Sequence, residues 1–239
     1  MFKAIITDIE GTTTSISFVK DILFPYSIEN VEGYLKKVWN EETFINLKDE
    51  LIKSSASKEY EKINLIKEPK TIDDVVFNVK KWIGNDIKVT PVKELQGLIW
   101  EEGYKNGSLK GHVYDDVVPA LERFKDKGIN LYVYSSGSVK AQKLLYQHTN
   151  KGDLTKYFDN YFDTNIGHKI DSTSYKKIAD KIGVKPLEGL FLTDVAKEAI
   201  AAEGAGMKTI LVVRPGNEPL IPGSCDHIQQ IKSFDEIVC

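Results

Sequence analysis

The sequence predicts an α/β protein whose parallel sheet is interrupted, after its first strand, by a helical insert. Residues 3–7 (KAIIT) are almost wholly apolar, as expected for a strand that is covered on both faces. Strand-like and helix-like segments alternate after Gly111, which is typical of βαβ units and a parallel sheet. Between these two regions, apolar residues recur at helical spacing and strand signals are absent.

The insert is expected to span residues 19–110 and to consist of amphipathic helices. Apolar side chains recur at helical spacing in three segments, Val31–Trp39, Asp73–Trp82 and Val92–Trp100. Pro91 precedes the third segment and fits the first turn of a helix, where no backbone N–H is needed. We therefore predict a separate α-helical domain here, and an α/β domain made of residues 1–18 and 111–239.

In the α/β region, helices alternate with strands. The predicted helices are Pro119–Gly128, Ser138–His148, Ser174–Gly183 and residues 196–206. The predicted strands are Ile129–Ser135, Leu190–Thr193 and Lys208–Val213. Ser138 is placed to cap the start of its helix. Gly128 and Gly183 end the first and third of these helices.

Composition and charge exclude several classes of protein. The 239-residue chain has a net charge of -3, so no strongly basic surface points to nucleic acid. No apolar run approaches the roughly 20 residues of a membrane span, and the N-terminal run is too short for a signal peptide. Cys225 and Cys239 have neither CxxC nor metal-ligand spacing, which favours a reducing compartment. We therefore expect a cytoplasmic protein, also nuclear if the organism is eukaryotic, that binds neither nucleic acid nor membrane. We further expect it to be a monomer that binds a small molecule.

Polar residues follow three of the expected strands. Asp8 and Glu10 come after the first strand, Ser135 and Ser136 end the next, and Asp194 follows a later one. Ligands of open parallel sheets bind beyond the carboxyl ends of the strands, so these residues are expected to lie near one another. A lone Asp-x-Glu would be explained more simply as a solvated loop, but the coincidence of three strand ends favours a site.

The acids are suited to metal-assisted phosphate chemistry. Asp8 and Asp194 are candidates to share one Mg²⁺, which prefers oxygen ligands and offsets the repulsion between clustered carboxylates. A carboxylate beside Mg²⁺ can attack phosphorus, and Asp8, at the strand end, is the candidate nucleophile. Glu10 lies two residues on, points the same way on an extended chain and is the candidate general acid and base.

Two further groups are candidates to bind the phosphate. Ser135 and Ser136, with the N–H of Gly137 at a helix start, form a plausible phosphate cradle, although such runs are more often simple turns. Lys169 is placed to hold phosphate and to offset the charge of Asp8, with an ordinary surface charge as the alternative.

Glu198 follows Asp194 by four residues on the same helical face. It is a candidate to hydrogen-bond the site residues without touching the substrate. An exposed charge on a helix is equally compatible with the sequence. Other kinds of site lack their signatures. The four histidines do not cluster, and GxxxxGK[ST], GxGxxG and GxSxG are all absent from the sequence.

These residues resemble the haloacid dehalogenase-like hydrolases, which carry Asp-x-Asp/Glu and Ser/Thr at strand ends, a later lysine and a distal acid. Five segments further resemble the acireductone synthase family, the enolase-phosphatases of methionine salvage: residues 8–27, 134–145, 161–175, 190–195 and 212–217. The likeness spans nearly the whole chain and is weakest from about Val31 to Lys93. Ser15 stands where that family usually has proline, which leaves the acids untouched.

The resemblance implies a Rossmann-like parallel sheet core, an inserted α-helical cap domain and a bifunctional, Mg²⁺-dependent phosphoric monoester hydrolase. Such an enzyme enolises 2,3-diketo-5-methylthiopentyl-1-phosphate and then releases phosphate to give the acireductone 1,2-dihydroxy-3-keto-5-methylthiopentene. The family roles fall on two groups of residues. Asp8, Glu10 and Asp194 would bind one Mg²⁺ per subunit, and Ser135, Ser136 and Lys169 would bind the substrate. Glu10 would reach the metal through its side chain or its main-chain carbonyl.

Closure of the cap would exclude water from the site. Phe24, Trp100 and Tyr104 flank the insert and are candidates to line a pocket for the methylthio tail, although ordinary core packing explains each one alone. Two other functions stay open at this point. One is a Mg²⁺-dependent phosphatase that does not enolise its substrate, and the other is a non-catalytic binding protein. A dehalogenase is disfavoured because its chemistry needs neither Mg²⁺ nor Glu10.

Overall fold

A six-stranded, wholly parallel sheet forms the centre of the α/β unit in the computed structural model, which describes residues 2–238. Its strands are β1 (Ala4–Thr7), β2 (Asn130–Tyr134), β3 (Asn160–Phe162), β4 (Gly189–Thr193), β5 (Lys208–Val212) and β6 (Gln229–Ile231). They lie in the order β3-β2-β1-β4-β5-β6, and every neighbouring pair is parallel. The predicted α/β class with a parallel sheet is confirmed.

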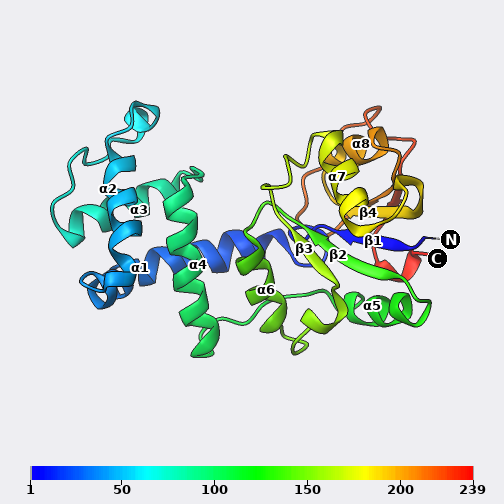
Figure 1. The fold of residues 1–239 in the computed structure, drawn as a ribbon, viewed down its shortest axis with the longest axis horizontal. Helices are drawn as coiled ribbons and strands as arrows, with labels where there is room; N and C mark the ends of the chain where they lie inside the picture. Colours follow the sequence, from blue (N-terminus) through cyan, green and yellow to red (C-terminus); the bar gives the residue numbers. More distant parts are fainter. Residues whose placement is uncertain (1, 239) are drawn as a thin grey trace. The chain divides into compact units, whose positions relative to one another are not determined.

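Helices cover both faces of this sheet. They are α5 (Val117–Asp126), α6 (Val139–Gln147), α7 (Ser172–Ile182) and α8 (Ala196–Gly204). Figure 1 shows α5 and α6 on one face and α7 and α8 on the other. Because both faces are covered, β1 is buried along its whole length, which explains its almost wholly apolar sequence.

Local sequence signals set several helix ends. The Ser138 hydroxyl accepts a hydrogen bond from the N–H of Ala141, so the predicted cap of α6 is confirmed. α7 ends at Gly183, whose φ of 73° is left-handed and suits glycine. α5 begins at Val117, two residues before the proline that was expected to start it. Pro119 still lies in the first turn, where its missing N–H costs no helical hydrogen bond.

The contacts divide the chain after Phe18 and after Leu109, so residues 19–109 form a second unit. The second boundary comes one residue earlier than the sequence analysis placed it. This unit contains α1 (Phe24–Val38), α2 (Ile45–Ser55), α3 (Ile72–Gly84) and α4 (Thr90–Lys105), and no strand occurs in residues 19–109. Its core includes Leu35, Leu51, Trp82 and Leu95, contributed in turn by the four helices. Across residues 2–238, no helix combines the length and the apolar character that a bilayer crossing requires.

A buried amide fixes the long connection between α2 and α3. Asn78 on α3 is 0% exposed and donates hydrogen bonds to Ser55 Oγ (2.9 Å) and to the carbonyl of Ile66 (2.8 Å). Its Oδ1 accepts a hydrogen bond from the Ile66 N–H at 2.8 Å. One side chain thus satisfies both main-chain groups of Ile66.

We expect Asn78→Leu to lower the free energy of unfolding by about 2–3 kcal/mol, because both main-chain groups of Ile66 lose their partner. Urea denaturation measures this loss. Asn85→Ala is the matched control, since Asn85 is exposed and bonds only the Lys81 carbonyl, and its effect should stay within about 0.5 kcal/mol. Equal losses in the two variants would contradict the role assigned to Asn78.

Candidate active site

Asp8 and Asp194 lie at the carboxyl ends of β1 and β4, the two neighbouring strands at the centre of the sheet. The strand order reverses between them, because the chain builds outward through β2 and β3 on one side and through β5 and β6 on the other (Figure 1). Thr7 pairs with Leu192, so Asp8 lies one residue and Asp194 two residues beyond this pair. Ligands of open α/β sheets bind at such a switch point.

The Asp8 carboxylate is buried and held in one orientation. Its side chain is partnered on both oxygens, by the Ile9 N–H at Oδ1 (2.7 Å) and by the Lys169 ammonium at Oδ2 (2.7 Å). The Thr7 hydroxyl donates to the Asp8 carbonyl at 2.8 Å and steadies the end of the strand. A carboxylate fixed in this way has a defined orientation at the sheet edge before any ligand binds.

Lys169 joins two carboxylates from different elements, Asp8 at the end of β1 and Glu198 on α8. Its ammonium lies 2.7 Å from Asp8 Oδ2 and 2.6 Å from Glu198 Oε2, and only 8% of the residue is exposed. The Thr193 hydroxyl donates to the same Glu198 oxygen at 2.8 Å. Burial alone would lower the pKa of Lys169, but the two carboxylates raise it above its ordinary value, so Lys169 is a cation. The surface-charge alternatives for Lys169 and Glu198 are thereby excluded.

Asp194 is partly buried and faces an excess of negative charge. Burial, and then the charge of Asp8, raise the pKa of Asp194 to about 7. Three carboxyl groups thus surround the single buried ammonium of Lys169; they belong to Asp8, Asp194 and Glu198. A divalent cation between Asp8 and Asp194 would offset this excess.

The backbone beside Asp194 leaves room that only glycine allows. Gly11 has a φ of 71°, and a Cβ built on it would overlap Asp194 Oδ2. The same Cβ would lie 3.1 Å from Asn217 Oδ1, a buried oxygen that has no hydrogen-bond partner within residues 2–238. Two carboxylates and a vacant amide oxygen form an all-oxygen donor set, so the residues fit Mg²⁺.

Glu10, two residues beyond Asp8, is partly exposed. In the described part of the chain, no group of three or more His, Cys, Asp or Glu side chains is arranged to hold a metal ion. A cation here would therefore draw its remaining ligands from main-chain carbonyls, water and substrate, as Mg²⁺ commonly does.

We expect Gly11→Ala to abolish tight Mg²⁺ binding, because the new methyl group displaces the Asp194 carboxylate. Gly128→Ala is the matched control, since Gly128 has a φ of 72° but a Cβ added to it would meet nothing within 4 Å. Both variants should lose about 1 kcal/mol of stability from the left-handed backbone. Calorimetric titration with Mg²⁺ separates them, and normal binding by Gly11→Ala would show that Asp194 does not need this space.

Ser135 and Ser136 lie at the end of β2, which pairs with β1, so they share the sheet edge with Asp8. Ser135 is buried and Ser136 is exposed. The N–H of Gly137, expected to face the phosphate, donates to Ser135 Oγ at 3.3 Å. Both serines thus lie at the sheet edge, while the Gly137 amide is already engaged.

The aromatic residues expected at the cap differ from one another. Tyr104 is buried, and Phe24 is partly buried against the helical core, which is ordinary core packing. The Trp100 indole N–H donates to the Leu23 carbonyl at 3.0 Å. None of the three is thereby placed in a substrate pocket.

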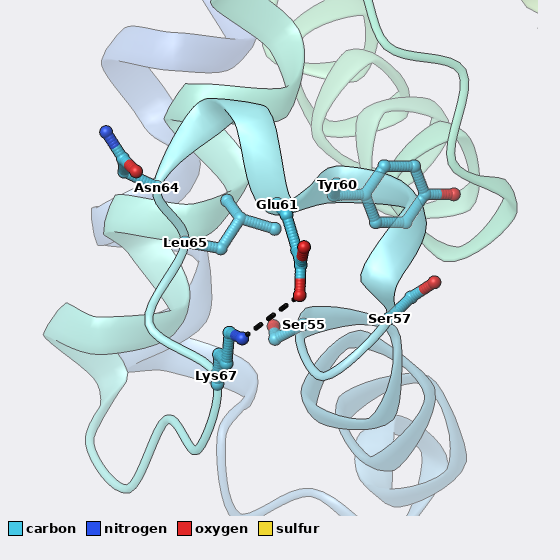
Figure 2. Close-up of a pocket in the computed structure, with 7 residues that line it drawn as sticks. All are labelled: Ser55, Ser57, Tyr60, Glu61, Asn64, Leu65 and Lys67. Atoms are coloured by element: carbon cyan, nitrogen blue, oxygen red, sulfur yellow. Dashed lines mark hydrogen bonds and ion pairs between the residues drawn. The ribbon is translucent and has the colours of Figure 1, made fainter.

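A pocket of about 470 Å³ lies wholly within the helical unit (Figure 2). It is lined by Ser55, Ser57, Tyr60, Glu61, Asn64, Leu65 and Lys67. Its one ion pair joins Lys67 to Glu61 at 3.4 Å, and no paired carboxylates line it. This pocket therefore lacks the clustered carboxylates that lie at the sheet edge.

The loop after β5 clamps the loop after β1, which the sequence analysis did not foresee. Arg214 Nε donates to the Thr12 carbonyl at 3.1 Å, and Asn217 Nδ2 donates to the Gly11 carbonyl at 2.9 Å. Arg214 is buried, stacks 4.3 Å from the ring of Tyr114 and is therefore fixed itself. The available signal was the Arg-Pro-Gly-Asn run directly after a predicted strand, at the same edge as the acids.

Known proteins share this architecture. The model of the haloacid dehalogenase-like hydrolases matches residues 2–206. Proteins named enolase-phosphatase E1 from Sulfurihydrogenibium sp. (strain YO3AOP1) and from Caenorhabditis elegans are each 50% identical to this chain. The alignments cover 99% of this chain, with 98% of the first relative and 97% of the second. The crystal structure of the UTR4 protein of Saccharomyces cerevisiae has a TM-score of 0.80 at 33% identity and covers 99% of this chain and 100% of that one.

A more distant structure, CbbY from Rhodobacter sphaeroides in complex with phosphate, has a TM-score of 0.57 at 17% identity, which supports the fold alone. Its alignment covers 99% of this chain and 96% of that one. The family resemblance in the sequence is confirmed by the close relatives. The chain belongs to the enolase-phosphatase E1 family of the haloacid dehalogenase-like hydrolases.

Proposed function

We propose that this enzyme is a Mg²⁺-dependent enolase-phosphatase of methionine salvage. It converts 2,3-diketo-5-methylthiopentyl-1-phosphate to 1,2-dihydroxy-3-keto-5-methylthiopentene and phosphate. One observation carries the assignment: a buried Asp8, paired with Lys169, lies at the switch point beside Asp194, in a chain 50% identical to proteins named enolase-phosphatase E1.

Asp8 is the proposed nucleophile. One of its carboxylate oxygens attacks phosphorus, and the bond from phosphorus to the substrate oxygen breaks as the aspartyl phosphate forms. The leaving oxygen takes a proton from Glu10. A water molecule then attacks the same phosphorus and gives its proton to Glu10, which releases phosphate and regenerates the Asp8 carboxylate.

Lys169 supplies the positive charge at this centre. It lies against Asp8, so it is placed to balance the charge of the phosphate as the Asp8 carboxylate is consumed. Glu198 holds the lysine from the other side at 2.6 Å. Ser135 and Ser136 at the neighbouring strand end are proposed to bind the phosphate oxygens, as the sequence predicts.

Asp8 and Asp194 would hold Mg²⁺ through carboxylate oxygens, together with Glu10 through its main-chain carbonyl or its side chain. Bound there, Mg²⁺ would polarise substrate oxygens and stabilise the negative charge of both steps. Glu10 is the proposed base that takes the proton from the carbon beside the carbonyl in the enolisation step. Residues 19–109 are the proposed cap domain, which excludes water while the enol persists.

The decisive experiment follows both steps on the diketone phosphate, enol by absorbance and phosphate by release, with and without Mg²⁺. We expect the enol signal to precede phosphate, and exhaustive chelation to stop both. Phosphate released without an enol would assign a simpler phosphatase, and full activity after chelation would remove Mg²⁺ from the proposal. The cytoplasmic location and the monomeric state stay predictions from the sequence.

A further inference from the structure

Asn217, in the loop after β5, presents one side-chain oxygen whose identity is fixed by its surroundings. Its Nδ2 donates to the carbonyls of Gly11 (2.9 Å) and Val212 (3.1 Å). A flipped amide would set its oxygen against both carbonyl oxygens, so the observed orientation is the only one that satisfies them. Oδ1, which can only accept, therefore points away from these two groups.

This acceptor is buried and unused. Asn217 is partly exposed as a residue, but its Oδ1 is inaccessible to solvent and has no hydrogen-bond partner in the described chain. Buried polar atoms in folded proteins are normally hydrogen-bonded, so water or a ligand is expected to satisfy Oδ1. The missing partner is a hydrogen-bond donor or a cation, since an amide oxygen carries no proton.

The location of Oδ1 indicates what that partner is. A Cβ built on Gly11 would lie 3.1 Å from Asn217 Oδ1 and would overlap Asp194 Oδ2, so both oxygens face the same small space beside Gly11. Asp194 is one of the two carboxylates proposed to hold a cation, so Asn217 Oδ1 lies beside the proposed metal site. Mg²⁺ loses its water molecules reluctantly and keeps several of them in protein sites.

We propose that Asn217 is a positioning residue whose Oδ1 accepts a hydrogen bond from a water molecule of the hydrated Mg²⁺ held by Asp8 and Asp194. The inference rests on the proposed function, because it needs that metal site. Through Nδ2 the same amide holds the Gly11 carbonyl, so the loop after β1 and the hydration of the cation are tied to one side chain. Groups of this kind orient the ligands of a metal and tighten its binding.

The test measures Mg²⁺ affinity by calorimetric titration of the full chain without substrate, so that it does not depend on activity. We expect Asn217→Ala to weaken Mg²⁺ binding about tenfold and to reduce the rise in melting temperature that Mg²⁺ produces. If Asn217→Ala does not fold, Asn217→Ser is used, because its hydroxyl is too short to reach the position of Oδ1.

Arg214→Lys is the control for a purely structural role. It loosens the same loop at the Thr12 carbonyl but has no atom facing the proposed cation. We expect it to lower the melting temperature in chelator while leaving Mg²⁺ affinity within about twofold of the wild type. Equal weakening in Arg214→Lys and Asn217→Ala, or unchanged affinity in Asn217→Ala, would overturn the proposal.

Asp194→Asn separates this inference from the function on which it rests. If the wild type binds Mg²⁺ and Asp194→Asn does not, the metal site stands, and the result for Asn217 is judged alone. If the wild type does not bind Mg²⁺, or if Asp194→Asn binds it equally well, the metal site itself fails and the role of Asn217 fails with it.

Discussion

Asp8→Asn is expected to lower the rate of phosphate release by at least about 10³-fold, because an amide oxygen is too weak a nucleophile to form the phosphoenzyme. The fold should survive the change. Lys169 keeps its 2.6 Å ion pair with Glu198, and the amide is close in size to the carboxylate that it replaces. The loss should therefore fall on the turnover number rather than on the amount of folded protein.

The measurement combines a phosphate assay with circular dichroism and thermal unfolding of the same sample. Asp126→Asn is the matched control, since Asp126 is exposed at the end of α5 and the same chemical change there should leave activity intact. Phosphate release at the wild-type rate in a folded Asp8→Asn variant would contradict the nucleophile assignment. Retention of the enol signal in that variant would agree with Glu10 as the enolisation base, because Asp8→Asn leaves Glu10 unchanged.

The sequence was sufficient for the central strands and for the main acids. β1, β2, β4 and β5 are buried, so their apolar residues are visible without tertiary information. Asp8 and Asp194 follow directly from those strands, because their position at a strand end fixes the sheet edge at which they lie. The local sequence therefore predicted the four central strands and the two acids at their carboxyl ends.

The edges of the sheet and one helix were not predicted. β3 and β6 have three residues each and begin with the exposed Asn160 and Gln229, so they lack the apolar pattern of a buried strand. They are held by pairing with β2 and β5, which is a property of the neighbour rather than of the segment. In the insert, α2 was missed because much of its surface is polar and only Leu47, Leu51 and Ser55 are buried.

Long-range polar contacts were also beyond the sequence. Asn217 and Gly11 are 206 positions apart. Both follow predicted strands at the same sheet edge, but the sequence does not specify that a side-chain amide of one holds a carbonyl of the other. Lys169 was a candidate to offset the charge of Asp8, but the sequence left the choice open because a lysine in a loop is usually solvated. Only the burial seen in the structure distinguishes an ion pair that organises the site from a surface charge.

Lys169→Met carries the second large expected effect, a loss of about 3–5 kcal/mol in the free energy of unfolding near neutral pH. Methionine fills a similar volume but leaves the carboxylates of Asp8 and Glu198 buried without their cation. Lys176→Met, an exposed lysine on α7, is the matched control and should change stability by no more than about 0.5 kcal/mol. Urea denaturation in chelator measures both variants.

The pH dependence identifies the cause of that loss. Burial and the charge of Asp8 already raise the pKa of Glu198, and removal of the Lys169 ammonium raises it further. In the variant, the folded state then binds more protons than the unfolded state, so stability falls as the pH rises through the raised pKa and returns as the pH is lowered. In the wild type, the pKa of Lys169 lies above its ordinary value of 10.5. Lys169 therefore stays charged from about pH 5 to about pH 8, and its own titration does not alter stability in this range. The deficit of Lys169→Met should therefore be large at about pH 8 and clearly smaller at about pH 5. A deficit that stays constant over this range would mean that lost packing, rather than uncompensated charge, causes the instability.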